Sequence, residues 1–207
     1  MSDDLKSLRE KARAGDPDAQ LALARTLWSG DGVGEDKGEA LKWYRAAAQT
    51  GGPQHKMALG LILCWEEGPH QNFNEGFDWV LRAAELGDLS AQHFVAAEYA
   101  TGENVPQNPE RAFHWYEMAA KSGHAEAQYN LALMYWEGEG VTKNVGEAQR
   151  WLLESAKQGE LFALRALSEA YEQGRYGLPR DANQAKYWKE KYDAVKERKT
   201  GSERNNL

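Results

Sequence analysis

The residues of this 207-residue chain that are best suited to catalysis or metal binding are five histidines and one cysteine. The histidines are His55, His70, His93, His114 and His124. They stand in five different local sequences, with no His-x-x-x-His pair that would place two metal ligands on one helix face. Cys64 lies in an apolar run, residues 61–65, which predicts a small buried side chain and not a nucleophile. We therefore predict no metal site, no cofactor and no catalytic residue.

Two further patterns that would suit an enzyme have simpler explanations. The glycine-rich stretch 30–38 is similar to a phosphate-binding loop, but it lacks the Gly-Lys-Ser/Thr ending and follows a predicted helix. We interpret it as an interhelix turn. The carboxylate pairs Glu66/Glu67 and Glu137/Glu139 are interpreted as solvated turn residues, with an acidic ridge as the alternative. The chain contains no Gly-x-Ser-x-Gly nucleophile elbow.

The composition is that of a soluble globular protein. Lys and Arg number 25 against 32 Asp and Glu, giving a formal net charge of -7, and 42% of the residues are hydrophobic. A single cysteine excludes an intramolecular disulfide. The first residues carry acids where a secretory signal carries bases, and no apolar run reaches the ~18 residues of a membrane span. We expect a cytoplasmic protein.

Charge is distributed unevenly along the chain. Residues 186–207 carry seven bases and four acids, so acids dominate the remainder. Nucleic acid binding needs a basic face, which this acidic body does not offer. Acidic surfaces instead attract cationic molecules. We therefore expect a partner of basic character, and neither nucleic acid nor a membrane.

The elements that must position these residues repeat every 36 positions. Three kinds of residue keep the spacing: Trp43, Trp79, Trp115, Trp151 and, after one extra residue, Trp188; Gly15, Gly51, Gly87, Gly123 and Gly159; and the small residues Ala24, Gly60, Ala96, Ala132 and Ser168. Such spacing is typical of repeat architectures. The predicted units are 1–16, an N-terminal half-repeat capping helix; 17–52, 53–88, 89–124 and 125–160, repeats 1 to 4; 161–197, repeat 5 with the C-terminal capping helix; and 198–207, a flexible tail.

Each unit is predicted to hold two helices joined by a turn. In the first unit, Asp16 and Pro17 supply an N-cap and an N1 proline to a helix whose apolar residues follow a 3.6-residue period. The second helix begins after the N-cap Asp36 and ends at Gly51, where we expect a left-handed cap. Its apolar stripe, which includes Trp43, cannot be buried within one unit. The units must therefore stack into an all-α, α/α superhelix.

Three segments carry a resemblance to a known family: Ala-Leu-Lys-Trp-Tyr-Arg-Ala-Ala-Ala at 40–48, Ala-Phe-His-Trp-Tyr-Glu-Met-Ala-Ala at 112–120, and Asn-Leu-Ala-Leu-Met-Tyr-Trp-Glu-Gly-Glu-Gly-Val at 130–141. They resemble the Sel-one-like repeats, relatives of the tetratricopeptide repeat, over residues 5–195. The resemblance implies a right-handed α/α superhelical solenoid of a bacterial type, whose first helices line a concave groove. The fifth unit departs from the pattern with Tyr192-Asp193 in place of Ala-Ala, which suits an exposed capping helix.

Tryptophans outside the 36-residue series are the first candidates for function, because the recurring residues already have a packing explanation. Trp28, Trp65 and Trp136 fall late in first helices, and Trp28 and Trp136 share one repeat position. By the resemblance, the concave groove presents Arg25, Trp28, Met57, Leu61, Trp65, His93, Phe94, Tyr129, Asn130, Leu133, Trp136, Arg165 and Glu169. Aromatic and arginine side chains are enriched at protein interfaces. For Trp65, packing in the helix seam is an equal alternative.

The residues and the resemblance together predict a non-catalytic scaffold or adaptor that binds a protein or peptide in this groove, as a monomer or weak dimer. Relatives act as adaptors in signalling and assembly, and some pair with toxins as immunity proteins, a special case of the same function. Two alternatives stay open. Some cysteine-rich relatives are β-lactamase-like hydrolases, a pattern from which a single cysteine departs. A homo-oligomeric structural spacer would use the same surfaces on copies of itself.

Overall fold

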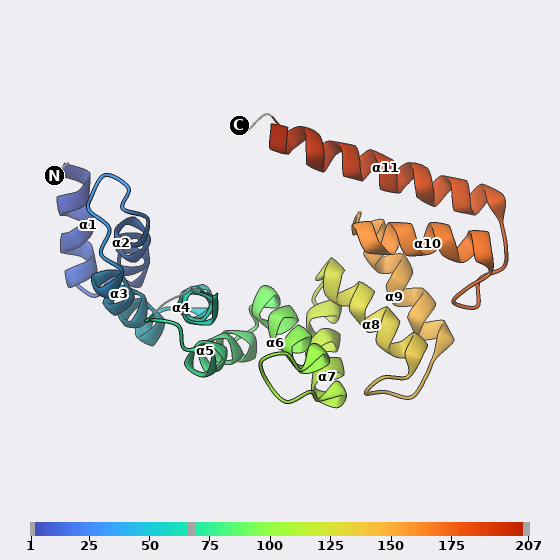
Figure 1. Ribbon diagram of the computed structural model, residues 1–207, viewed down its shortest axis with the longest axis horizontal. Helices are drawn as coiled ribbons and strands as arrows, with labels where there is room; N and C mark the ends of the chain where they lie inside the picture. The colour runs from blue at the N-terminus through green and yellow to red at the C-terminus, as the bar shows by residue number, and fades with distance from the viewer. Residues whose placement is uncertain (1–2, 66–68, 205–207) are drawn as a thin grey trace. The chain divides into compact units, whose positions relative to one another are not determined.

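The computed structural model describes residues 3–65 and 69–204, and within these ranges the chain is helical, with no strand. The helices are α1 (Asp3–Arg13), α2 (Pro17–Ser29), α3 (Lys37–Thr50), α4 (Pro53–Trp65), α5 (Phe73–Glu85), α6 (Leu89–Thr101), α7 (Pro109–Lys121), α8 (Ala125–Glu137), α9 (Val145–Lys157), α10 (Leu161–Gln173) and α11 (Ala182–Arg204) (Figure 1). The predicted all-α solenoid class is confirmed. None of the helices described is long and apolar enough to cross a membrane.

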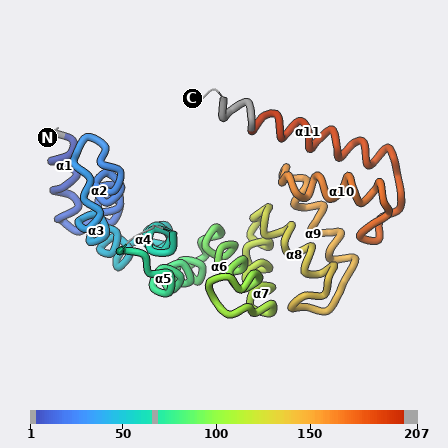
Figure 2. The backbone as a smooth tube through the Cα atoms, viewed as in Figure 1, coloured from blue at the N-terminus to red at the C-terminus, as the bar shows by residue number. Residues whose placement is uncertain are grey.

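The two helices of every repeat are joined by the same backbone hydrogen bond. The N–H of the residue that caps the second helix donates to a carbonyl late in the first helix, at 2.8–2.9 Å. The five pairs are Asp36 to Leu27, Asn72 to Leu63, Asn108 to Tyr99, Asn144 to Tyr135 and Asp181 to Tyr171. Each capping side chain also accepts hydrogen bonds from N–H groups of the first turn that the helix leaves unpaired. The interhelix turns, visible in Figure 2, are therefore fixed where the second helix begins.

The predicted left-handed cap at Gly51 is wrong. Gly51 has φ −79° and ψ 173°, which is extended backbone. Its counterparts Gly15, Gly87, Gly123 and Gly159 have φ between 82° and 94°. The difference arises because α3 continues to Thr50, one residue further in its repeat than α5, α7 and α9 in theirs. Glycine is needed at 51 for space, since a Cβ there would lie 2.4 Å from Cγ of His55.

Small residues at the middle of each helix pair let the two helices approach closely. In repeat 1 these residues are Ala24 and Ala40, both fully buried. In repeat 2 they are Gly60 and Gly76, and a Cβ on Gly60 would lie 2.8 Å from the carbonyl oxygen of Gly76 and 2.5 Å from Cγ2 of Val80. Helices α4 and α5 are therefore closer together than side chains at these two positions would allow.

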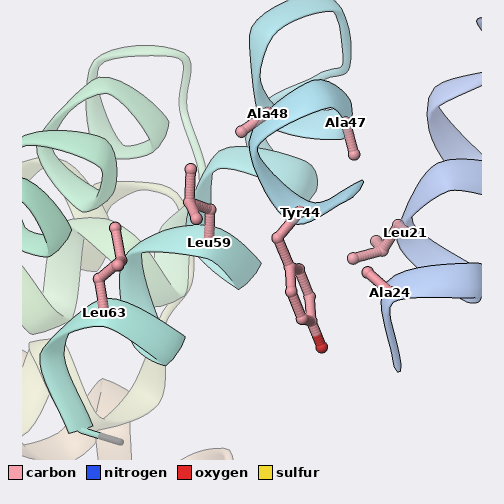
Figure 3. Close-up of a cluster of buried hydrophobic side chains, with 7 residues drawn as sticks. All are labelled: Leu21, Ala24, Tyr44, Ala47, Ala48, Leu59 and Leu63. Carbon is pink, nitrogen blue, oxygen red and sulfur yellow. The ribbon is translucent and has the colours of Figure 1, made fainter. Parts of the chain in front are cut away.

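The chain divides into two compact units, residues 1–95 and 96–207, with the boundary inside α6. Unit 1 (residues 1–95) contains a core cluster formed by α2, α3 and α4: Leu21, Ala24, Tyr44, Ala47, Ala48, Leu59 and Leu63. Figure 3 shows Tyr44 of α3 in the middle of this cluster, with α2 on one side and α4 on the other. The half-buried rings of Trp28 and Trp43 pack against both this cluster and a second one that includes Leu5, Leu23 and Leu27.

Buried side chains on the first helices link neighbouring repeats. Gln20 donates to the carbonyl of Ala12, Gln92 to that of Ala84 and Gln128 to that of Ala120, each from Nε2 at 3.1 Å. In repeat 2, Lys56 stands at the same position and donates to the carbonyls of Ala48 and Gly51. Except for Gly51, which follows α3, the acceptors are carbonyls at the end of the preceding helix, which have no partner within that helix.

The periodic tryptophans are less deeply buried than the stripe pattern predicted. Of the five, Trp151 is in the core, and Trp43, Trp79, Trp115 and Trp188 are half-buried. The residue after the tryptophan is the more buried one in repeats 1 to 4, where Tyr44, Val80, Tyr116 and Leu152 are at most 5% exposed. This second buried position is aromatic in only two repeats, so the 36-residue pattern does not mark it as the tryptophan position is marked.

The C-terminal helix is longer than predicted. Helix α11 continues to Arg204, so residues 198–204, expected to be a flexible tail, are helical instead. Its N-terminal part packs on α10, where Ser168 Oγ donates to the carbonyl of Ala185 at 2.9 Å. Of the predicted turn carboxylates, Glu137 and Glu139 are exposed, and Glu66 and Glu67 lie outside the described residues.

Candidate partner-binding surfaces

All thirteen residues predicted to face a partner are at least partly exposed. Arg25, Trp65, Arg165 and Glu169 are exposed, and the other nine are half-buried. They lie on the first helices of their repeats: α2, α4 and the start of α6 in unit 1, and α8 and α10 in unit 2 (residues 96–207). We call the exposed sides of these helices the unit 1 face and the unit 2 face.

Trp28 on the unit 1 face is attached to the core of its own repeat. Its ring meets Tyr44 edge-to-face, with centroids 5.9 Å apart, and Nζ of Lys37 lies 5.3 Å from its centre. Burial raises the pKa of Tyr44, and Arg25, which is hydrogen-bonded to the phenol, lowers it. Arg25, Trp28 and Tyr44 therefore form one group at the junction of α2 and α3, with the tryptophan partly in the core.

Trp65, in contrast, points outward from the end of α4. Its side chain is 57% exposed, and its ring meets Phe94 of α6 edge-to-face at 6.0 Å. Met57 and Leu61 are half-buried on the same side of α4, eight and four residues before Trp65. This exposure contradicts the alternative in which Trp65 packs in the helix seam. The unit 1 face thus carries a second aromatic group, formed by α4 and α6.

On the unit 2 face, helices α8 and α10 meet through aromatic rings. Tyr129 stacks on Phe162 with centroids 6.0 Å apart and an interplanar angle of 26°. The Arg165 guanidinium lies 5.6 Å from the centre of the Phe162 ring, and its Nε is 3.8 Å from Oε1 of Glu169. Phe162, Arg165 and Glu169 occupy positions i, i+3 and i+7 of α10, so they form one stripe along the helix.

Trp136 lies under a residue from the following repeat. Its ring is 4.8 Å from that of Tyr176, and Nζ of Lys143 is 4.7 Å from its centre. Tyr176 belongs to the loop between α10 and α11 and has a positive φ of 52°, which is uncommon for a residue other than glycine. The loop is held in place by Gln149, whose Nε2 donates to the carbonyl of Tyr176 at 2.7 Å.

The rings on the unit 2 face form one group with carboxylates and cations beside it. Burial raises the pKa of Tyr129, and Tyr176, Glu160 and Glu169 raise it further, while Arg165 lowers it. Burial also raises the pKa of Tyr176, with Glu137 and Glu169 adding to the effect and Arg175 opposing it. We call Tyr129, Trp136, Phe162 and Tyr176 the unit 2 aromatic cluster.

Two members of this cluster were missed by the sequence analysis, although the sequence carries a signal for each. Phe162 is the one large apolar residue in a column that otherwise reads Asp18, Gln54, Ser90 and Glu126 at 36-residue spacing. Tyr176 lies in the single insertion of the repeat pattern, just before Gly177. An apolar residue in a polar column and an aromatic residue in an insertion are both departures from what packing requires.

Helices α10 and α11 also line two open pockets, of about 430 Å³ and about 210 Å³, which share Ser168, Glu172 and Lys189. Lys189 and Asp193 stand at repeat positions that are Leu152 and Ala156 in repeat 4, where both residues are buried. The surface that would receive another repeat is therefore polar here.

His55, His124 and Cys64 each have a structural partner. His55 is 2% exposed, and its Nε2 lies 3.0 Å from Oδ1 of Asp18. His124 Nδ1 accepts from the N–H of Ala127 and caps α8. Cys64 is buried, as predicted, with Sγ 3.8 Å from the carbonyl of Phe73. In the part of the chain that the structure describes, no three His, Cys, Asp or Glu side chains are grouped to hold a metal ion.

The chain belongs to the Sel1 repeat family, which is the Sel-one-like repeat suggested by its sequence. Sel1 repeats match residues 17–51, 54–88, 89–124, 125–160 and 161–191. Sel1 repeat proteins typically mediate protein–protein interactions, and the family is generally non-catalytic. Comparison with curated proteins gives no match.

Solved structures share the fold. A Sel1 repeat protein from Oxalobacter formigenes is 32% identical, with a TM-score of 0.77 over 92% of this chain and 55% of that one. A protective antigen of uropathogenic Escherichia coli with an SLR fold is 29% identical, with a TM-score of 0.85 over 92% of this chain and 40% of that one. An immunity protein of Pseudomonas aeruginosa shares the fold at 22% identity, with a TM-score of 0.59 over 92% and 72%. The chain spans about half the length of the first two.

Proposed function

We propose that this chain is a non-catalytic scaffold that binds a protein or peptide partner on its first helices. The observation that carries the proposal is the set of aromatic side chains left exposed on the unit 1 and unit 2 faces, above all Trp65 and Phe162, which are 57% and 56% exposed. Large aromatic rings gain most when they are desolvated at an interface, and they lose little side-chain entropy there. Membership of the Sel1 repeat family supports the same function.

The proposed contact residues are those predicted from the sequence, with Phe162 and Tyr176 added. In unit 1 they are Arg25, Trp28, Met57, Leu61, Trp65, His93 and Phe94, and in unit 2 Tyr129, Asn130, Leu133, Trp136, Arg165 and Glu169. The partner is expected to be basic, because the chain has a net charge of -7 and the unit 2 aromatic cluster lies among carboxylates. We place the protein in the cytoplasm.

Affinity capture from the native cell, followed by mass spectrometry, tests the proposal. The bait is the wild-type chain, compared with Trp65→Ala, Trp136→Ala and the double variant. We expect a captured protein whose recovery falls at least tenfold with the double variant. A tenfold loss corresponds to ~1.4 kcal/mol, which is within the range for one interface residue. The identity of the captured protein then separates an immunity role from an adaptor role.

Leu86→Ala is the matched control for Trp65→Ala. Leu86 is also 57% exposed, but it lies just after α5, which is a second helix and outside both faces. If Leu86→Ala reduces recovery as much as Trp65→Ala does, the contact is not confined to the first helices and the proposed site is wrong. Light scattering after size-exclusion tests the spacer alternative, for which a stable oligomer of the chain alone is the expected result.

A further inference from the structure

A cation is already held on the unit 2 face by an aromatic ring and a carboxylate. The guanidinium of Arg165 lies over the Phe162 ring at 5.6 Å and pairs loosely with Glu169 at 3.8 Å. The side chains of Arg165 and Glu169 are about half exposed. An exposed ion pair and an exposed cation–π contact are each worth ~1 kcal/mol or less, so water or another cation can readily replace Arg165.

Helix α9 carries the same three components in a closed form. Arg150 lies 4.1 Å from the centre of the Trp151 ring and pairs with Glu147. Trp151 is only 6% exposed, so Arg150 covers what little of the ring reaches solvent. Phe162 is 56% exposed and therefore keeps ring surface open beside Arg165. The α9 arrangement stabilises the helix surface, whereas the α10 arrangement has room for a second group.

The surroundings of Phe162 favour a positive charge. Tyr129 stacks on the ring from α8, and Glu160 and Glu169 both lie near the Tyr129 phenol. Glu137 lies near the adjoining Tyr176. Two carboxylates, Glu160 and Glu169, thus lie beside the Tyr129–Phe162 pair, with Arg165 as the cation there, while Lys143 and Arg175 lie at the other end of the cluster, near Trp136 and Tyr176. Ring faces and carboxylates both attract ammonium and guanidinium groups.

We propose that the unit 2 aromatic cluster binds an arginine or lysine side chain from a basic segment of the partner, which displaces Arg165 from Phe162 and pairs with Glu169. This rests on the proposed function and names the chemistry of the partner. Arg165 is then an internal competitor. It occupies the site in the free protein and lowers the affinity of the site for every cationic ligand. The competition has a testable sign, because removal of a positive side chain at 165 strengthens binding.

The test uses a defined probe on the full chain. The probe is the peptide acetyl-Gly-Arg-Gly-Arg-Gly-amide, and its twin carries citrulline, the neutral isostere, in place of arginine. Binding is followed by NMR of protein labelled on its five phenylalanines, with Phe162→Leu used to assign the Phe162 signal. We expect a saturable shift of the Phe162 ring signals with the arginine peptide and none with the citrulline peptide.

Two variants and two controls then test the competition. Arg165→Gln should tighten arginine peptide binding by about two- to fivefold, and Glu169→Gln should weaken it by a similar factor, as expected from loss of one exposed cation–π or ionic contact. Lys157→Gln and Glu154→Gln make the same charge changes in an exposed ion pair on α9, which is not part of the unit 2 aromatic cluster, and should change binding less than 1.5-fold.

The proposal is overturned by any of three results. The first is a citrulline peptide that binds as well as the arginine peptide. The second is an Arg165→Gln variant that binds the arginine peptide no more tightly than Lys157→Gln does. The third is the absence of any shift of the Phe162 ring signals, in the wild-type chain and in Arg165→Gln, at millimolar peptide. Failure here is separable from failure of the proposed function. If capture of a partner depends on Trp136 but the Phe162 ring signals do not respond to the arginine peptide, the scaffold function still holds. An arginine peptide that binds while no partner is captured leaves only the cation site.

Discussion

The two units place a tryptophan at the same repeat position and use it differently. Trp28 contacts Tyr44 of its own repeat and packs against two core clusters of unit 1. Trp136 is covered instead by Tyr176, which comes from the loop of the next repeat. Each ring has a lysine near its face, Lys37 or Lys143, yet Trp28 extends a core and Trp136 belongs to a surface cluster.

The difference shows that a repeat position does not by itself decide between packing and recognition. The side chain next to the ring decides. For Trp28 it is Tyr44, which follows the periodic Trp43, and for Trp136 it is Tyr176, which lies in the insertion of repeat 5. Substitutions at equivalent repeat positions of the two units can therefore be compared in pairs, with each variant serving as the reference for the other.

The largest difference should come from the two tryptophans themselves. Trp28→Ala should lower the local free energy of unfolding of α2 and α3 by about 2–3 kcal/mol, because it leaves a cavity beside two core clusters. Trp136→Ala should lower that of α8 by about 1 kcal/mol, the value of one exposed ring pair. Hydrogen exchange measured peptide by peptide reports each unit separately. Equal protection losses in the two units would remove the distinction between a core and a surface tryptophan.

The helix crossings should give a somewhat smaller contrast. Gly60→Ala should destabilise unit 1 by about 2 kcal/mol, since the added Cβ would lie 2.5 Å from Val80 Cγ2 and 2.8 Å from the Gly76 carbonyl oxygen. Ala132→Gly, at the same repeat position, should destabilise unit 2 by about 1 kcal/mol through the lower helix propensity of glycine. Chemical denaturation with hydrogen exchange checks both values. If Gly60→Ala leaves the free energy of unfolding unchanged, α4 and α5 move apart without loss of stability.

The smallest contrast concerns alkaline stability. Tyr44 and Tyr116 share a repeat position and are both buried, and burial raises the pKa of each phenol. A raised folded-state pKa gives stability that is fully present below pH ~10 and is lost as the pH rises through the folded-state value, by at most ~1.4 kcal/mol per pH unit. Arg25 opposes the shift at Tyr44, whereas burial is the cause of the raised pKa of Tyr116.

Tyr116→Phe should therefore flatten the loss of stability between pH 10 and 11 more than Tyr44→Phe does. Denaturation midpoints at pH 8, 10 and 11 measure the effect, with pH 8 as the reference at which neither phenol is ionised. A larger flattening by Tyr44→Phe would show that the Arg25 contact does not reach the buried phenol in solution.

Most of the fold followed from residues that recur every 36 positions. The N-caps at Asp36 and its equivalents, the small residues at the helix crossings and the buried Cys64 were all predictable, because each depends on a residue and its near neighbours in sequence. The left-handed cap at Gly51 was predicted wrongly, since α3 continues one residue further than the second helices of repeats 2 to 4. The thirteen predicted contact residues are exposed to different degrees, and their role stays a prediction.

The sequence by itself determined the repeat, its family and the helices on which function has to be sought, because helix starts, helix ends and close crossings are local properties of the chain. The tertiary structure decided which rings stay open to solvent. Trp28 joined the core through Tyr44, Trp65 and Phe162 remained exposed, and Tyr176 reached Trp136 from another repeat. The exposure of a ring depends on side chains that are brought together from different helices, and the 36-residue spacing does not predict those contacts.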